Sequence, residues 1–150
     1  VSERGSEYNG FNIISGNVNE LHYYGNYQKG VQQIASGVHG LSNALLNTEW
    51  PKVERGKHQL IQVTSSDFIP ESLFELLKDE ELAPDEALPN TGVGYKKEKM
   101  LSPLFIKSEN YGSRCSTVIL VDYDNNVRFI ERTYNLIDFS HSEVDYRWKI

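Results

Sequence analysis

Residues 116–122 read Ser-Thr-Val-Ile-Leu-Val-Asp, and residues 127–132 read Val-Arg-Phe-Ile-Glu-Arg. The first run is mostly apolar, as in a buried strand, whereas the second alternates apolar and polar side chains, as in a strand with one covered face. Between them, Tyr-Asp-Asn-Asn at 123–126 supplies residues that favour a tight turn. This stretch therefore predicts an antiparallel hairpin.

A second hairpin is predicted upstream, with strands at 11–14 and 21–24 and a Gly- and Asn-rich turn between them. A short third strand is expected at 31–34. Residues 36–43, Ser-Gly-Val-His-Gly-Leu-Ser-Asn, alternate small and apolar side chains between glycines. This pattern predicts a tight strand whose backbone passes close to another part of the chain.

Between the two hairpins, apolar residues at helical spacing predict helices from Thr48 to Val63 and from Asp67 to Leu82. Residues 83–100 carry prolines and glycines and are interpreted as a long loop, while no order is predicted after Tyr134. We see no internal repeat and no second domain. The fold class is α+β, with helices packed against mainly antiparallel sheets.

Composition excludes several classes of protein. The 150 residues carry 15 basic and 21 acidic side chains, a net charge of −6, with no basic cluster. Such a chain repels phosphate backbones, which argues against a nucleic-acid partner. No apolar run reaches the ~20 residues of a membrane-spanning helix. The chain also begins Val-Ser-Glu-Arg-Gly, with neither Met nor a signal peptide, so we expect it to be a fragment.

Most familiar catalytic signatures are missing. The four histidines have no metal-pair spacing, and the single cysteine, Cys115, has no partner for a zinc site or a disulfide. No phosphate-binding loop, dinucleotide fingerprint or serine nucleophile elbow occurs. Arg114 can lower the pKa of the neighbouring thiol, but no base is in sight, so we interpret Cys115 as a small buried strand residue.

Two polar residues are the candidate site. Asn43 follows the Gly-flanked segment, where its amide can donate to a developing oxyanion; the alternative is an asparagine that satisfies nearby backbone groups before a helix. Arg114 stands at the entry of the strand at 116–122, where its guanidinium can orient a carboxylate or a carbonyl; the alternative is a salt bridge at a strand end.

Several motifs, in order along the chain, resemble the transport and Golgi organisation protein 2 family, also called the NRDE family. They are Tyr-Asn-Gly-Phe-Asn (8–12), Gly-Val-His-Gly-Leu-Ser-Asn-Ala (37–44), Trp-Pro-Lys-Val (50–53), Leu-Pro-Asn-Thr-Gly-Val (88–93), Leu-Ser-Pro-Leu-Phe-Ile (101–106), Tyr-Gly-Ser-Arg-Cys-Ser-Thr-Val (111–118) and Glu-Arg (131–132). Cys115 stands where family members usually have serine. The family's initial Met-Cys-Thr and its Asn-Arg-Asp-Glu motif are absent. The chain thus resembles the C-terminal part of a single family domain, residues 1–150.

The resemblance implies an N-terminal-nucleophile-hydrolase-like αββα sandwich, here incomplete. In related acylases a processed N-terminal cysteine is the nucleophile, an asparagine helps to form the oxyanion hole, and an arginine lies near the nucleophile. By motif position the last two roles fall on Asn43 and Arg114, with the nucleophile absent from this chain.

Two functions follow from the resemblance. In the first, the whole protein handles haem or an acyl lipid such as acyl-CoA, in secretion and Golgi organisation. It is then cytoplasmic with mitochondrial or Golgi association, requires no cofactor, and binds haem as a transported ligand, with Tyr23, Tyr24 and Trp50 as candidate wall residues. In the alternative, it is a cysteine-dependent amidohydrolase or acyl hydrolase. The 150 residues alone are expected to be inactive and to expose sheet faces that absent strands cover.

Overall fold

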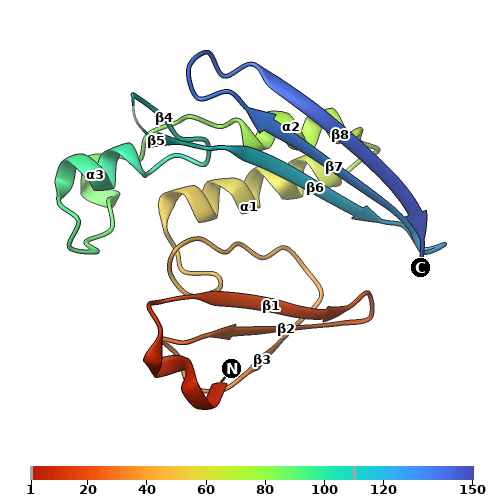
Figure 1. Ribbon diagram of the computed structural model, residues 1–150, viewed down its shortest axis with the longest axis horizontal. Helices are drawn as coiled ribbons and strands as arrows, with labels where there is room; N and C mark the ends of the chain where they lie inside the picture. The colour runs from red at the N-terminus through yellow and green to blue at the C-terminus, as the bar shows by residue number, and fades with distance from the viewer. Residues whose placement is uncertain (1, 110) are drawn as a thin grey trace. The chain divides into compact units, whose positions relative to one another are not determined.

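The computed structural model describes residues 2–109 and 111–150 (Figure 1). The chain divides into two compact units, Val1–Glu49 and Trp50–Ile150, each of which is described by itself. Both combine strands with helical turns, and every sheet in the described residues is antiparallel. The α+β class predicted from the sequence is confirmed.

The first unit is a three-stranded sheet followed by a long loop. A 3-10 helix, Ser2–Glu7, precedes β1 (Asn12–Asn17), β2 (Glu20–Gly25) and β3 (Gln32–Ile34), which lie in the order β1-β2-β3. Gly16 has a φ of +155°, and a Cβ there would lie 2.0 Å from the carbonyl oxygen of Glu20, so only glycine fits this position. The predicted hairpin and third strand are confirmed, but residues 36–43 form no strand.

The second unit begins with two helices, α1 (Pro51–Thr64) and α2 (Pro70–Leu77). Each starts with a proline, whose fixed φ suits the first helical position and whose missing N–H costs nothing there. A 3-10 turn, Asp85–Ala87, and a short helix, α3 (Tyr95–Met100), follow. The second predicted helix is therefore shorter than expected, and the predicted loop at 83–100 contains a helical segment.

Five strands complete the second unit. The short pair β4 (Lys107–Ser108) and β5 (Tyr111–Gly112) precedes a sheet in the order β6-β7-β8, whose strands are Cys115–Val121, Asn126–Tyr134 and His141–Lys149. The hairpin β6–β7 confirms the prediction from 116–132. The third strand, β8, lies in the C-terminal region for which the sequence had given no prediction.

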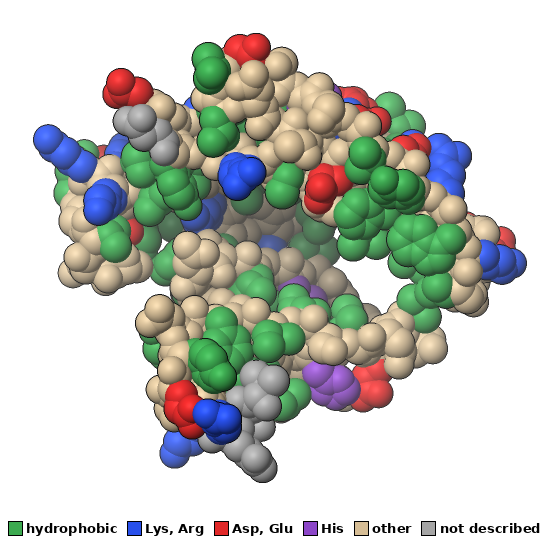
Figure 2. Space-filling model, in the orientation of Figure 1, with side chains coloured by type: hydrophobic (Ala, Val, Ile, Leu, Met, Phe, Trp, Pro, Cys, Tyr) green, Lys and Arg blue, Asp and Glu red, His purple; other side chains and the backbone are tan. Residues whose placement is uncertain are grey.

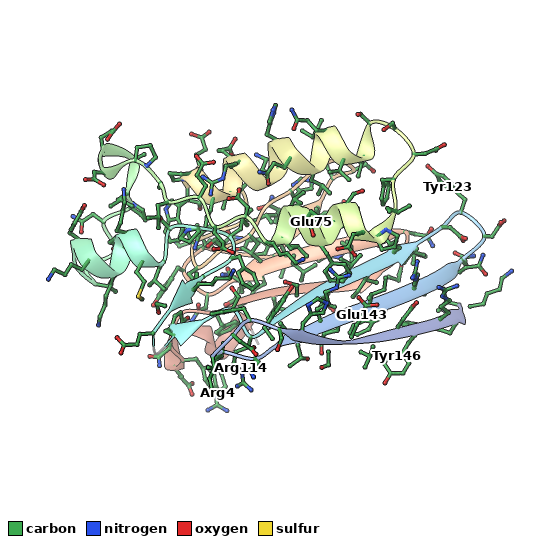
Figure 3. All side chains as sticks on the ribbon, turned by 90° about the horizontal axis from the view of Figure 1, so that it is seen from above. Arg4, Glu75, Arg114, Tyr123, Glu143 and Tyr146 are labelled. Carbon is green, nitrogen blue, oxygen red and sulfur yellow. The ribbon has the colours of Figure 1, made fainter. Side chains whose placement is uncertain are left out.

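The core of the second unit lies between the helices and one face of the β6–β8 sheet. Buried Leu73 and Phe74 from α2 pack on Val118 of β6 and Ile130 of β7, and partly buried apolar residues of α1, α2 and β6 surround them. Figure 3 shows α1 and α2 on one side of this sheet. None of the described helices of this unit lies over the other face of the sheet.

Candidate functional site

The loop that carries Asn43 is fastened to the sheet of the first unit by Tyr23 and Asn12. Tyr23 is 0% exposed; its hydroxyl donates to Asn12 Oδ1 at 2.6 Å and accepts the N–H of Leu46 at 3.1 Å. The Asn12 amide in turn donates to the carbonyl of Ala44 at 3.0 Å. Two of the quoted motifs, at 8–12 and 37–44, therefore meet through a buried polar network. Tyr23 is thus a core residue and not a wall residue for a ligand.

A second set of hydrogen bonds closes the same loop on itself. Asn47, with a φ of +59°, accepts the N–H of Gly40 at its Oδ1 and lies 2.9 Å from His39 Nδ1 through its amide nitrogen. The other ring nitrogen of His39 lies 2.9 Å from the carbonyl oxygen of Ala35. Because a carbonyl only accepts, this geometry requires the proton on Nε2. His39 therefore has a structural role in this loop.

Asn43 itself is exposed in a bend of this loop. The predicted position at the end of a strand is wrong, because β3 ends at Ile34 and the following residues are held by side-chain hydrogen bonds instead of a ladder. Asn43 does not cap the next helix either, since the N-cap residue of α1 is Trp50. Among the described residues no hydrogen bond engages its amide, so the group faces outward and can meet a ligand.

Arg114 lies at the start of the β6–β8 sheet. Its carbonyl accepts the N–H of Tyr134 at 2.8 Å, which fixes the backbone, while its side chain is exposed. No hydrogen bond or ion pair with another described residue engages the guanidinium, so the predicted alternative of a strand-end salt bridge is not seen among the described residues. Cys115 is also exposed; the prediction of a buried thiol is wrong because this residue belongs to the uncovered face.

The backbone before Arg114 is organised by another pair of motifs. The Ser113 hydroxyl accepts the N–H of Ile106 at 3.0 Å, and the Ser113 N–H donates to the Ile106 carbonyl at 2.9 Å. The motif at 101–106 thereby aligns the motif at 111–118. Asn43 belongs to the first unit and Arg114 to the second, so their surroundings are described separately.

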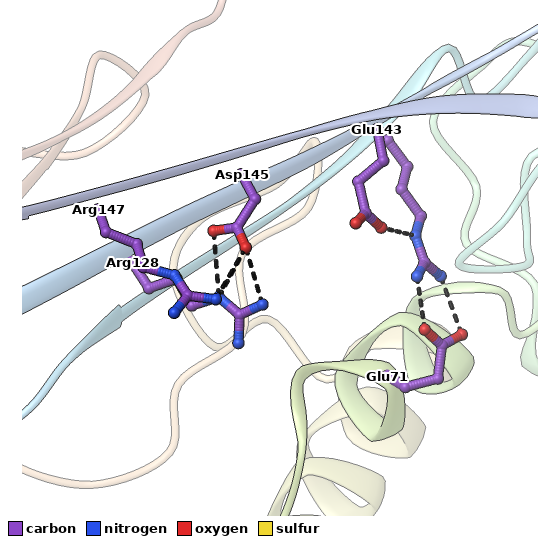
Figure 4. A network of polar contacts seen from close by, with 6 residues as sticks. Glu71, Arg128, Glu143, Asp145 and Arg147 are labelled. Carbon is purple, nitrogen blue, oxygen red and sulfur yellow. Dashed lines mark hydrogen bonds and ion pairs between the residues drawn. The ribbon is translucent and has the colours of Figure 1, made fainter.

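Arg132, from the Glu-Arg motif, forms the main charged cluster, which spans α2, β7 and β8 (Figure 4). Its guanidinium donates to both carboxylate oxygens of Glu71, at 3.0 and 2.5 Å, and to Glu143 at 2.8 Å, and it lies 3.9 Å from the centre of the Phe74 ring. The hydrogen bonds from Arg132 lower the pKa of Glu71 to about 2. Each of the three guanidinium nitrogens of Arg132 already donates to a carboxylate. Arg132 is therefore a structural residue and not a ligand site.

Asp145 anchors the neighbouring part of the same network. Arg128 donates to both of its oxygens at 2.9 to 3.2 Å, and Arg147 adds a bond at 3.1 Å. The hydrogen bonds from Arg128, and to a smaller extent the one from Arg147, lower the pKa of the Asp145 carboxyl to about 2. The cluster was not predicted, because its partners lie up to 61 residues apart and no local pattern reveals them.

The uncovered side of the sheet, which we call the open face, carries most of the exposed apolar side chains of this sheet. Strand register places alternate residues of β6, β7 and β8 on this side. Ile119 is 60% exposed, Tyr146 59% and Trp148 46%; Figure 3 shows Tyr146 pointing away from the helices, and Figure 2 shows hydrophobic side chains gathered along the sheet. The apolar side chains of the open face are those of Ile119, Val121, Val127, Phe129, Val144, Tyr146 and Trp148. Polar residues and Cys115 also lie on this side, among them Thr117 and Glu131, which are joined by a hydrogen bond of 2.8 Å.

This surface differs from scattered apolar exposure. Phe129 and Tyr146, from adjacent strands, have ring centroids 6.4 Å apart, so these two aromatic side chains are neighbours on the face. Contiguous apolar patches on a protein surface mark sites that bind ligands or other protein segments. No sequence motif pointed to it; the signal that was missed is the alternation of Val, Tyr and Trp with charged residues at 143–149.

Two further properties concern the whole of the described chain. None of its helices has the length and apolar character that crossing a membrane requires. No three His, Cys, Asp or Glu side chains within 2–109 and 111–150 gather as they would around a metal ion.

An α+β unit with a charged network under its helices and an apolar open face is the class of structure that these residues define. A family model described as Transport and Golgi organisation 2 matches residues 1–136. The chain belongs to this family.

Curated relatives carry the same name. The chain is 36% identical to the human "Transport and Golgi organization protein 2 homolog", over 96% of this chain and 58% of that protein. It is 35% identical to the mouse protein, over 97% and 58%, and 29% identical to the Drosophila melanogaster protein, over 73% and 43%. The chain therefore spans little more than half the length of the curated mammalian relatives that it matches.

Proposed function

We propose that this chain is the C-terminal part of a single family domain and that the whole protein handles haem or an acyl lipid such as acyl-CoA. The open face carries the proposal: an apolar wall of three strands suits the flat porphyrin or the acyl chain of such ligands. The family name adds transport and Golgi organisation, and we place the protein in the cytoplasm, associated with the Golgi or with mitochondria. In this proposal haem is a carried ligand, and we expect no cofactor to be required.

The proposed architecture is an αββα sandwich in which a second sheet faces the open face. Two sheets that pack in this way lie about 10 Å apart and bury both inner faces. Ligand would lie between them, with Ile119, Tyr146 and Trp148 as one wall. This arrangement explains why the more apolar face of the sheet is the face without helices.

Arg114 gives the proposed cleft a polar end. It directly precedes Cys115 and its carbonyl accepts the N–H of Tyr134, so its exposed side chain stands at the end of the sheet, one residue beyond the open-face position of Cys115. Haem carries carboxylates and acyl-CoA carries phosphates, and a guanidinium binds either group in a bidentate manner. An exposed arginine at the end of a sheet with an apolar face thus suits ligands with an apolar body and an anionic end.

Ligand titration of the full-length protein tests this function. We expect a saturable Soret shift with haem, or saturable binding of palmitoyl-CoA by calorimetry, at micromolar protein. Changing Tyr146 and Trp148 to serine should abolish binding, and Arg114→Gln should weaken it. Tyr123→Ser is the matched control, because Tyr123 is fully exposed at the tip of the β6–β7 hairpin, away from the open face. Binding of neither ligand, or equal loss in the control, would contradict the proposal.

A second candidate function is a cysteine-dependent amidohydrolase or acyl hydrolase whose nucleophile lies upstream. The observation that favours it is that Asn43 and Arg114 both present exposed side chains without described partners, as groups that meet a substrate must. In full-length protein with its initiator Met removed, Asn43→Ala should lower the turnover of acyl-amide or acyl-thioester substrates about 100-fold or more, as for other oxyanion-hole donors. Absence of turnover in the full-length protein with its initiator Met removed and no other change would exclude this function.

A further inference from the structure

The outer edge of β8 is open. Among the described strands, β8 pairs only with β7, and each of its nine residues is exposed. An exposed edge of this length presents a row of free N–H and C=O groups that can pair with another strand. Charged side chains on an edge strand usually hinder pairing with other strands. The arrangement of charges on β8 therefore decides which strand it can pair with.

The backbone hydrogen bonds show which residues of β8 direct their N–H and C=O groups toward the open edge. The N–H of Ile150 donates to the carbonyl of Asn125 at 3.1 Å, so even-numbered residues of this strand direct their backbone groups toward β7. In an antiparallel ladder the direction alternates, and the odd-numbered residues therefore face the open edge. These residues are Glu143, Asp145, Arg147 and Lys149.

The outward-facing residues have a sign pattern that is complementary to itself. Two acidic residues precede Tyr146 and two basic residues follow it, at equal distances. We propose that β8 pairs antiparallel with β8 of a second copy of this chain, with Tyr146 opposite Tyr146. Asp145 then lies opposite Arg147 of the second copy, and Glu143 opposite Lys149, twice each by symmetry.

Backbone geometry and charge select the same register. The four charged residues become the hydrogen-bonded pairs, and the two Tyr146 residues form the central non-hydrogen-bonded pair, as an isologous dimer requires. Moving the centre to Asp145 or to Arg147 places that residue opposite its own copy and leaves two of the four pairs of opposite charge, which is less favourable. A parallel pairing in register also opposes like charges. The same charges that hinder pairing with other strands thus favour pairing with β8 of a second copy.

The apolar side chains agree with this register. On the open face, Val144 lies opposite Trp148 of the second copy, and Tyr146 meets its symmetry mate. On the other face, Asp145 already accepts hydrogen bonds from Arg128 and Arg147, and Glu143 from Arg132, so the acidic half is fixed in place before association. The two sheets would join into one six-stranded sheet with a continuous open face.

Disulfide trapping tests the register directly. In a Cys115→Ser background, which removes the exposed native thiol, Tyr146→Cys places two thiols in the close central pair, where Cα atoms lie about 4.5 Å apart. Val144→Cys is the matched control, because position 144 faces Trp148 of the second copy and not itself. Mild oxidation should give covalent dimer with Tyr146→Cys and little with Val144→Cys. Equal cross-linking of both, or of neither, would overturn the register.

Charge reversal tests the association itself. Wild-type chain should sediment as a dimer in equilibrium with monomer. Changing Arg147 and Lys149 to glutamate should raise the dissociation constant at least about tenfold, because acid then faces acid. The control, Lys96 and Lys97 to glutamate, makes the same change in net charge on α3 and should leave association unchanged. A monomeric wild type at hundreds of micromolar, or equal effects of both double variants, would overturn the proposal.

Discussion

The two faces of the β6–β8 sheet invert the usual distribution of polarity. The face toward the helices buries Val118 and Ile130 but also the guanidinium of Arg132, whereas the open face exposes isoleucine, tyrosine and tryptophan. A charge is buried only where partners satisfy it, and Glu71 and Glu143 do so here. The comparison teaches that helices of the same unit pack on one face, whereas the other face leaves large apolar side chains exposed, and our proposal assigns it a partner.

The largest expected difference between the two faces comes from one substitution made on each. Ile130 on β7 is buried in the core, and Ile119 on β6 is mostly exposed on the open face. Ile130→Ala should lower the free energy of unfolding by about 2–5 kcal/mol, because it leaves a cavity. Ile119→Ala should change it by less than about 1 kcal/mol. Urea denaturation of the 150-residue chain measures both, and similar losses would show that the open face is part of a core.

A smaller loss is expected from Arg132→Met, which keeps an unbranched apolar stem and removes the guanidinium and its charge. The variant breaks the pairs with Glu71 and Glu143 and the contact with the Phe74 ring, and we expect a loss of about 2 kcal/mol. The two carboxylates are partly exposed and regain water, which keeps the loss below that of a fully buried pair. Arg147→Met, an exposed arginine on the same face, is the control and should cost less than about 1 kcal/mol. Equal losses of unfolding free energy in the two variants would contradict the stabilising role given to the pairs of Arg132 with Glu71 and Glu143.

The pH dependence of stability should distinguish the same network. The folded-state pKa of Glu71 lies at about 2, below its ordinary value of 4.5. A lowered pKa means that the stabilisation is fully present above about pH 4.5 and is lost as the pH falls toward 2. Unfolding free energy should therefore decline across this window, and the decline should be smaller in Arg132→Met. An unchanged slope in the variant would contradict this assignment. Because Glu71 is half exposed, we expect a modest effect.

Local sequence patterns predicted the elements whose partners are near in the chain. The hairpin at 116–132 and the one at 11–24 follow from alternation and turn residues, and α1 follows from helical spacing. Strand β8 was missed, although Val144, Tyr146 and Trp148 alternate with charged residues as in a strand. The apolar residues of this strand lie on the uncovered face of the sheet and not in the core. Helix α3 has only six residues and no apolar stripe, and tertiary contacts such as Thr91 to Glu98 hold its segment.

The candidate site was predicted only in part for a related reason. Motif position selected Asn43 and Arg114, and both side chains are exposed, but the loop of Asn43 depends on Tyr23 and Asn12, which a local pattern cannot show. Cys115 was expected to be buried because it begins an apolar run, yet every second residue of that run lies on the open face. Which face of a strand is covered depends on long-range packing and on parts of the protein beyond the strand itself.

The central claim is that the open face becomes an interior wall in the whole protein, and hydroxyl-radical footprinting tests it most directly. Modification of Ile119, Tyr146 and Trp148 would be compared between the 150-residue chain and the full-length protein, with fully exposed Tyr123 as the internal reference. We predict that all three become several-fold less reactive in the full-length protein while Tyr123 keeps its reactivity. Equal modification of the open face in both proteins would contradict the account.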